Sequence, residues 1–262
     1  MTDPVLVTIE GAVATLSLNR PGLGNTIDVS LAQGLLAAAI RCDQDPAIRC
    51  VVLTGKGRLF CGGGDLGALA GAGEAMPGFL SELAGTLHMA VSRLMRMEKP
   101  LLVLVNGPAA GAGLSLAIAG DVVLAAGSAH FTAAYGGVGL SPDGGMSWLL
   151  PRLVGLRRAQ EIILTNRRIG AEEAERIGLV TRTVEDAALA SEGAEVAAGL
   201  ATSATRALGL ARGLLADSLS SGLETQLERE ARAIAEAGRT PDGREGIAAF
   251  LARRKPDFTG RR

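Results

Sequence analysis

The chain has 262 residues, enough for one large domain, and 48% of them are apolar while only 3% are aromatic, so its core must be aliphatic. Its 26 basic and 27 acidic residues give a net charge of −1, and the basic ones are scattered, which argues against a nucleic-acid-binding or membrane-surface protein. Residues 1–4 lead into a predicted strand, and no apolar run is long enough to cross a bilayer, so we expect neither a signal peptide nor a transmembrane helix.

The three cysteines, Cys42, Cys50 and Cys61, show neither the spacing of a disulfide framework nor that of a metal site. Unpaired cysteines of this kind are typical of a reducing compartment. We therefore expect a cytoplasmic protein without a bound metal.

The first hundred residues predict a hairpin, two amphipathic helices and a buried strand. We expect the hairpin over residues 5–9 and 12–18, the helices over 30–43 and 79–97, and the strand over 49–53. A glycine-rich motif, Phe60-Cys61-Gly62-Gly63-Gly64-Asp65-Leu66, follows that strand. Its three glycines fit either a flexible loop or a close approach of the backbone to a ligand. The next segment, 68–78, is rich in glycine and alanine, and we expect it to be mobile.

Residues 101–126 are the stretch around which the rest of the chain is organised. They predict a buried strand over 101–105, a turn through Gly111-Ala112-Gly113, a short helix over 114–119 and a second strand over 122–125. A helix that begins at small residues has unpaired N–H groups facing whatever lies in front of it, so it can hold a negative oxygen. The sequence therefore predicts an oxyanion-binding site here.

After residue 171 the sequence is mostly helical, with amphipathic helices predicted over 187–200, 203–217, 223–237 and 241–252. Such a run of helices after an α/β region indicates a C-terminal layer used for packing or subunit contacts. The two histidines, His88 in a predicted helix and His130 in a predicted short strand, are interpreted as packing residues.

Several chemistries are poorly supported. The sequence contains no G-x-S-x-G motif, no cluster with metal-ligand spacing and no Walker loop. Residues 111–117 form a loose dinucleotide-binding motif, but the strand over 122–125 ends without the acid that would bind a ribose hydroxyl. Two glycine-rich strand ends remain, and their backbone N–H groups could converge to stabilise an enolate oxygen.

At this point the sequence resembles a known family. The motif over 60–66 is similar to F-[SC]-A-G-A-D-[IL] of the crotonase, or enoyl-CoA hydratase/isomerase, superfamily, and residues 105–117 with Gly120-Asp121 resemble its V-N-G-x-A-x-G-G-G block. Further resemblances lie at residues 18–21 with Asn25, at 149–155, at Glu245-Gly246 with Phe250, and at 254–256. Together they cover nearly the whole chain in the family's order.

The resemblance implies an α/β fold, a crotonase-like spiral of ββα units over residues 1–200, with a C-terminal helical trimerisation region over 201–262. It also implies a homotrimer or dimer of trimers acting in acyl-CoA and fatty acid metabolism. The substrate would be an acyl-CoA thioester, with coenzyme A as part of the substrate and no separate cofactor. The oxyanion N–H groups map onto Gly62 and Ala112. The CoA moiety would lie at Gly22, Leu23 and Gly24, with Arg58 near its phosphates. The other implied substrate contacts are Gly63, Gly64, Asp65, Ser115, Tyr135 and Leu140.

The departures from the family pattern bear on the reaction. Hydratases of this family use two glutamates, and those positions here are Ser115 and Tyr135. Asp143, in the segment 140–145, lies where the resemblance places the single acid of Δ3,Δ2-enoyl-CoA isomerases and of phenylacetate-pathway ring isomerases. A wall of Leu140, Met146 and Trp148 would desolvate this acid and make it a better base. Alternatively, Asp143 only caps the helix that follows.

We therefore expect an isomerase that shifts a double bond from Δ3 to Δ2 through a thioester enolate, with Asp143 carrying the proton. Two alternatives remain open. The chain could be an enoyl-CoA hydratase or catalyse another enolate reaction on a CoA thioester. It could also bind acyl-CoA without turnover, because both family glutamates are missing.

Overall fold

The main sheet has six strands, built from the aliphatic runs of the sequence. In this computed structural model, which describes residues 3–260, their order is β1-β2-β3-β4-β6-β9. The strands are β1 (Val5–Glu10), β2 (Val13–Leu18), β3 (Cys50–Gly55), β4 (Leu101–Val105), β6 (Val122–Ala126) and β9 (Arg182–Val184). The β1–β2 hairpin is antiparallel and every other pairing is parallel. The predicted hairpin and the predicted strands over 49–53, 101–105 and 122–125 are thus confirmed.

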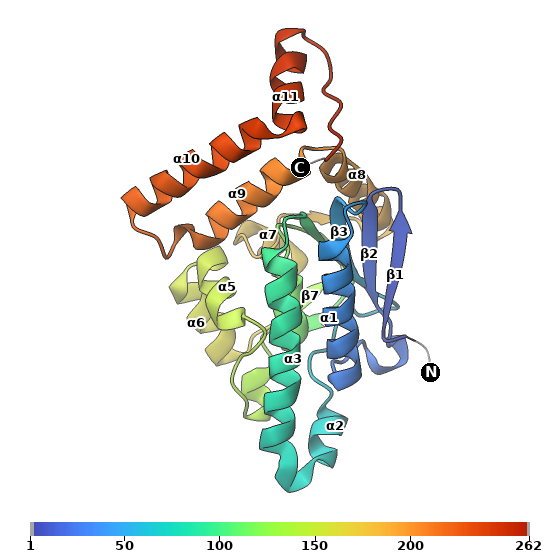
Figure 1. Cartoon of the computed structure of the whole chain (residues 1–262). Coiled ribbons are helices and arrows are strands. Elements are labelled where there is room, and N and C mark those ends of the chain that lie inside the picture. The colour runs from blue at the N-terminus through green and yellow to red at the C-terminus, as the bar shows by residue number, and fades with distance from the viewer. Residues whose placement is uncertain (1–2, 261–262) are drawn as a thin grey trace.

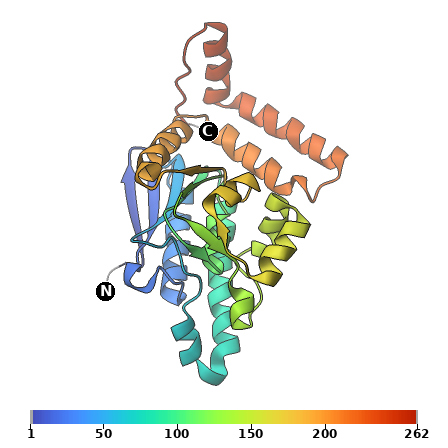
Figure 2. The same cartoon turned by 180° about the vertical axis from the view of Figure 1, so that it is seen from behind.

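Helices cover both faces of this sheet because parallel strands expose apolar side chains on both sides. Helices α1 (Val29–Gln44) and α3 (Met76–Arg96) lie side by side across one face, as Figure 1 shows. Helix α8 (Leu189–Ala201) packs against β2, β3, β4 and β6 on the other face, in front of the strands in Figure 2.

A second, small sheet of three strands lies beside the main one. It consists of β5 (Ala109–Ala110), β7 (His130–Thr132) and β8 (Ile169–Gly170). Helix α4 (Ala112–Ala117) follows β5 directly, and all six of its residues are buried. The remaining elements of this half are η3 (Tyr135–Val138), α5 (Met146–Val154), α6 (Leu156–Thr165) and α7 (Ala171–Arg176).

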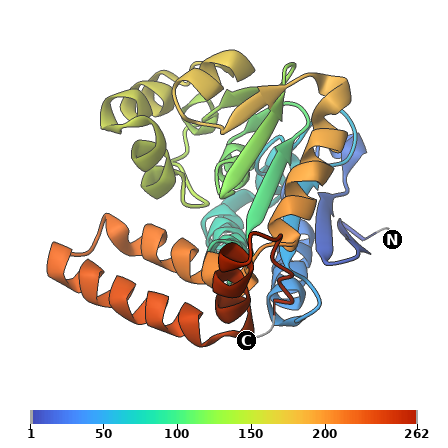
Figure 3. The same cartoon turned by 90° about the horizontal axis from the view of Figure 1, so that it is seen from above.

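The last three helices form an arm that projects from the body of the molecule (Figures 1 and 3). They are α9 (Thr205–Ser218), α10 (Leu223–Arg239) and α11 (Pro241–Leu251). Helix α10 has no buried residue, and apolar side chains such as Leu223, Ile234 and Phe250 are exposed on the arm. The expected mixed α/β fold with a helical C-terminal region is therefore observed.

Segment 68–78, which is rich in glycine and alanine, is mostly helical: it holds most of α2 (Leu66–Gly71), η2 (Gly73–Ala75) and the start of α3. Residues 179–180 lie in a bend before β9. A short 3₁₀ helix, η1 (Pro21–Leu23), precedes α1, and another, η4 (Asp186–Ala188), precedes α8. Within residues 3–260, no helix combines the length and the apolar character needed to span a membrane.

Candidate active site

The predicted glycine motifs meet at a cavity of about 110 Å³ between the main sheet, α2, α3 and η3. Gly62, Gly63 and Gly64 line one side, and Gly111 and Ala112 lie beside them. The rest of the wall is aliphatic and comes mainly from Leu66, Leu69, Leu80, Leu83, Leu87, Val138 and Leu140. Five of these leucines lie on α2 and α3, and they close the cavity over the glycine loops.

The two glycine-rich segments can approach each other only because side chains are absent. Gly63 has a φ of +95°, and a Cβ there would lie 2.8 Å from the carbonyl oxygen of Ala110. A Cβ on Gly113 would lie 2.2 Å from the carbonyl oxygen of Cys61. The Ala110 N–H donates to Cys61 O at 3.0 Å, which ties the segments together. The glycines therefore serve close backbone approach and not flexibility.

The assignment of Gly62 as an oxyanion donor needs correction. Its N–H donates to Gly24 O at 2.9 Å and cannot serve a ligand at the same time. Within the described chain, the N–H of Gly64 has no hydrogen-bond acceptor, and neither does that of Ala112 at the first position of α4. Because Gly64 and Ala112 both line the cavity, they are the pair available to a bound oxygen.

On the other side of the cavity, Asp143 lies in a small polar network. The phenol of Tyr135 donates to Asp143 Oδ1 at 2.5 Å. The Ser115 hydroxyl donates to the main-chain oxygen of Asp143 at 2.9 Å and lies 3.5 Å from the Tyr135 hydroxyl. Burial, reinforced by the charge of Asp143, raises the pKa of Tyr135 above its usual value, so the phenol stays protonated and donates.

The interpretation of Asp143 as a helix cap is wrong. Helix α5 begins at Met146, its N-cap is Gly145, and no side chain caps it. The loop before it is held instead by His88 on α3, whose Nε2 accepts from Gly144 N–H at 3.0 Å. His88 was interpreted as a packing residue, and nothing in its sequence spacing indicates that α3 passes this loop.

The expected wall around Asp143 is also only partly present. Leu140 lines the cavity with Asp143, and Met146 is buried. Trp148 does not line this cavity; it lines a neighbouring surface hollow together with His88 and with Asp143 itself, and Arg152 stacks 4.0 Å from the centre of its ring. The apolar wall of the cavity that Asp143 lines therefore comes mainly from leucines of α2 and α3.

Other predicted substrate residues have structural partners. Asp65 caps α2 by accepting from Ala68 N–H at 3.1 Å and pairs with Arg20 at 3.2 Å, and it does not line the cavity. Ser115 is fully buried behind Tyr135 and does not line the cavity either. We correct both assignments, because these side chains hold neighbouring groups in place. Gly63, Gly64, Tyr135 and Leu140 do line the cavity.

The predicted CoA loop lies at η1. Gly22 and Leu23 line a surface hollow, whereas the carbonyl of Gly24 accepts the Gly62 N–H. Arg58 is exposed in the loop after β3. Across residues 3–260, no three His, Cys, Asp or Glu side chains gather in a way that could hold a metal ion.

Comparisons with known proteins agree with the family resemblance of the sequence motifs. The sequence profile described as enoyl-CoA hydratase/isomerase matches residues 8–261. The chain belongs to the enoyl-CoA hydratase/isomerase family. It is 39% identical to the 1,2-epoxyphenylacetyl-CoA isomerase of Escherichia coli, with both chains covered in full. It is 34% identical to 4-chlorobenzoyl coenzyme A dehalogenase-2 of an Arthrobacter species, over 92% of this chain and 88% of the relative.

Solved structures of the family have the same fold. An enoyl-CoA hydratase from Polaromonas sp. JS666 superposes with a TM-score of 0.93 at 35% identity, over 97% of this chain and 99% of that one. This family member is therefore an acyl-CoA enzyme with the crotonase fold, as the sequence motifs predicted. The names of its relatives include both isomerases and hydratases.

Proposed function

We propose that this enzyme isomerises an acyl-CoA by moving a double bond from Δ3 to Δ2, with Asp143 as its one proton carrier. A single observation carries the proposal: among the described residues that line the cavity, Asp143 is the only carboxylic acid. Hydration needs one group to activate water and another to handle the α-proton. The double-bond shift needs only one group that removes a proton and returns it.

The proposed reaction uses both sides of the cavity. Asp143 removes a proton from C2, the negative charge moves to the thioester oxygen, and the N–H groups of Gly64 and Ala112 stabilise it there. The same carboxyl then returns the proton to C4. Tyr135 holds Oδ1 of Asp143, which leaves Oδ2 to face the substrate carbons.

The acyl group would be apolar, because aliphatic side chains form most of the cavity wall. The relative named 1,2-epoxyphenylacetyl-CoA isomerase also supports an isomerisation of a CoA thioester. We place the CoA moiety at Gly22 and Leu23, with Arg58 near its phosphates. Gly24 has its carbonyl turned to the loop that carries Gly64.

The Asp143→Asn variant tests the proposal, because the amide cannot accept the C2 proton. We expect kcat for a 3-enoyl-CoA to fall about 10²- to 10⁴-fold, the usual contribution of a general base, while acyl-CoA binding persists. Unchanged turnover would remove Asp143 from the mechanism.

The hydratase alternative is supported by a relative named probable enoyl-CoA hydratase from Rhodobacter capsulatus, 41% identical over 97% of this chain and 96% of the relative. Loss of conjugated absorbance from a 2-enoyl-CoA would favour it. Binding without conversion across an acyl-CoA panel would instead favour a protein without turnover.

We also propose that the chain forms a homotrimer or a dimer of trimers in the cytoplasm. The exposed apolar side chains of the C-terminal arm, among them Leu223, Leu227 and Ile234 of α10, support self-association. All three cysteines are free, which supports a reducing compartment. Sedimentation equilibrium tests the assembly, and a monomer at micromolar concentration would contradict it.

A further inference from the structure

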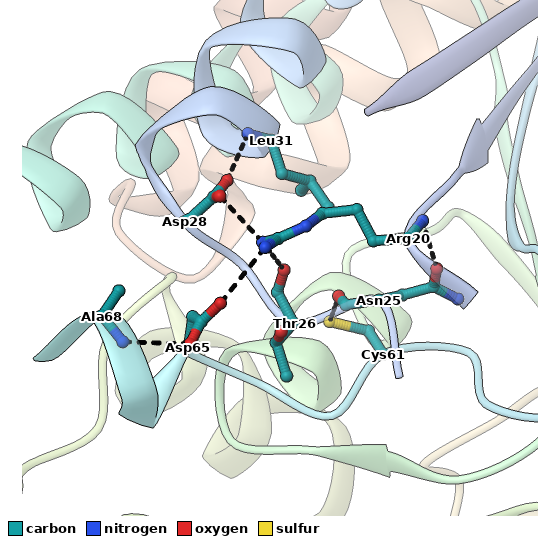
Figure 4. Close-up of polar contacts among 8 residues, drawn as sticks. All are labelled: Arg20, Asn25, Thr26, Asp28, Leu31, Cys61, Asp65 and Ala68. Atoms are coloured by element: carbon teal, nitrogen blue, oxygen red, sulfur yellow. Dashed lines mark hydrogen bonds and ion pairs between the residues drawn. The ribbon is translucent and has the colours of Figure 1, made fainter. Parts of the chain in front are cut away.

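Two segments far apart in the sequence, 24–27 and 61–65, run side by side next to the cavity (Figure 4). They are joined by three hydrogen bonds: Gly62 N–H to Gly24 O at 2.9 Å, Ile27 N–H to Gly63 O at 2.7 Å, and Asp65 N–H to Ile27 O at 2.9 Å. Gly63 O and Asp65 N–H both face Ile27, and backbone groups alternate along an extended chain. The N–H of Gly64 therefore faces the opposite way, toward the cavity.

The beginning of the 61–65 segment is held by Asn25, which is fully buried at a φ of +56°. Its Nδ2 donates to three main-chain oxygens, those of Lys56, Leu59 and Phe60, at 2.9–3.1 Å. The Cys61 thiol donates to Asn25 O at 3.1 Å, and burial raises the pKa of Cys61 to about 12, so the thiol keeps its proton. These contacts do not reach Asp65 at the other end of the segment, which is held by a separate tether.

Arg20 supplies that tether (Figure 4). Its Nη2 lies 3.2 Å from Asp65 Oδ2, and its Nη1 lies 3.0 Å from Asp28 Oδ2 and donates to Thr26 O at 2.7 Å. Both carboxylates are helix caps: Asp28 accepts from Leu31 N–H at the start of α1, and Asp65 accepts from Ala68 N–H at the start of α2. One guanidinium therefore joins the N-termini of α1 and α2 to the 24–27 segment.

The ion pairs are partly buried, with exposed side-chain fractions of 17% for Arg20, 26% for Asp28 and 21% for Asp65. Removing Arg20 would leave two neighbouring carboxylates without their shared counterion. A lysine keeps the charge but not the planar fork that reaches both acids and a carbonyl at once. The arrangement therefore depends on the geometry of the guanidinium.

We propose that Arg20 is a positioning residue that fixes the orientation of the Gly64 N–H, and so sets how strongly the enzyme polarises a thioester carbonyl. The inference rests on the proposed oxyanion pair, Gly64 and Ala112. A displacement of about 1 Å at such a donor is enough to weaken its effect strongly. Arg20 acts through Asp65 and does not line the acyl cavity, although it does line the surface hollow at Gly22 and Leu23.

The test compares the binding of butyryl-CoA with that of S-butyl-CoA, a thioether that lacks the carbonyl oxygen. The variants are Arg20→Lys and Asp65→Asn; asparagine still caps α2 but cannot form the ion pair. We expect the preference for the thioester to fall about tenfold in each variant. Both ligands carry the same CoA moiety, so a change in CoA binding at the hollow that Arg20 lines cancels in this ratio. Infrared difference spectra should show a smaller downshift of the bound carbonyl stretch in both variants.

Arg206→Lys is the matched control. Arg206 also pairs with two carboxylates, Glu98 and Glu236, and is 19% exposed, but it lies on α9. It should keep the wild-type preference even if its melting temperature falls. If Arg20→Lys and Asp65→Asn both keep the wild-type preference, the positioning role is overturned. If the wild-type enzyme shows no preference for the thioester, the oxyanion pair itself is wrong and the inference falls with it.

Discussion

The two sides of the cavity are built in different ways. The amide side consists of backbone from two glycine-rich segments, held by main-chain hydrogen bonds and by Arg20 from outside the cavity. The acid side consists of side chains from separate elements, with Tyr135 on η3, Ser115 on α4 and Asp143 before α5. A change on the amide side should therefore damage the fold, whereas a change on the acid side should damage mainly the reaction.

The largest expected effect on stability is on the amide side, in Gly113→Ala. A Cβ there would lie 2.2 Å from the carbonyl oxygen of Cys61, and backbone cannot move aside as a flexible side chain can. We expect a loss of about 3 kcal/mol in the free energy of unfolding, measured by urea denaturation. The control is Gly85→Ala on α3, where a Cβ meets open space and should stabilise the helix by about 0.5–1 kcal/mol. Equal stabilities of the two variants would refute the steric argument.

On the acid side, Tyr135→Phe should leave the fold intact and lower kcat. The lost hydrogen bond reaches a carboxylate, and such bonds contribute about 1.5–3 kcal/mol, so we expect a decrease of about 10- to 100-fold. Steady-state kinetics with a 3-enoyl-CoA measures it. Ser115→Ala, which keeps the Tyr135–Asp143 bond, should have a smaller effect, and the reverse order would contradict the assigned roles.

A pH titration sharpens the comparison further, because Tyr135 is the only tyrosine in the sequence and tyrosinate absorbance therefore reports this residue alone. Its pKa in the folded state lies above the unfolded value of about 10. The contribution of the protonated Tyr135 to the free energy of unfolding is therefore complete below pH about 10, and it is lost as the pH rises toward the pKa of Tyr135 in the folded state. We expect tyrosinate to appear only at the pH at which the protein unfolds, and circular dichroism measures that unfolding. A folded protein that shows tyrosinate near pH 10 would disprove the buried hydrogen bond.

The elements of the fold were predictable because they depend on local pattern. The continuous aliphatic run at 101–105 became β4, and the amphipathic run at 223–237 became α10. Leu66 and Leu69 were missed as cavity residues, because the glycine and alanine between them hid the short helix α2. Its signal was nonetheless present, since Asp65 stands where an N-cap belongs.

By itself, the sequence determined the aliphatic core, the order of the main strands and helices and the two glycine-rich strand ends, because each depends on neighbouring residues. The choice of Asp143 as the acid came only from the family resemblance, since its neighbours fit a helix cap equally well. Only the tertiary structure decided that Gly64 and not Gly62 has a free N–H, since that depends on the Gly24 carbonyl. It also decided that Tyr135 holds Asp143 and that His88 holds the loop beside it. Long-range hydrogen bonds leave no periodic mark in a sequence, so they appear only when the chain is folded.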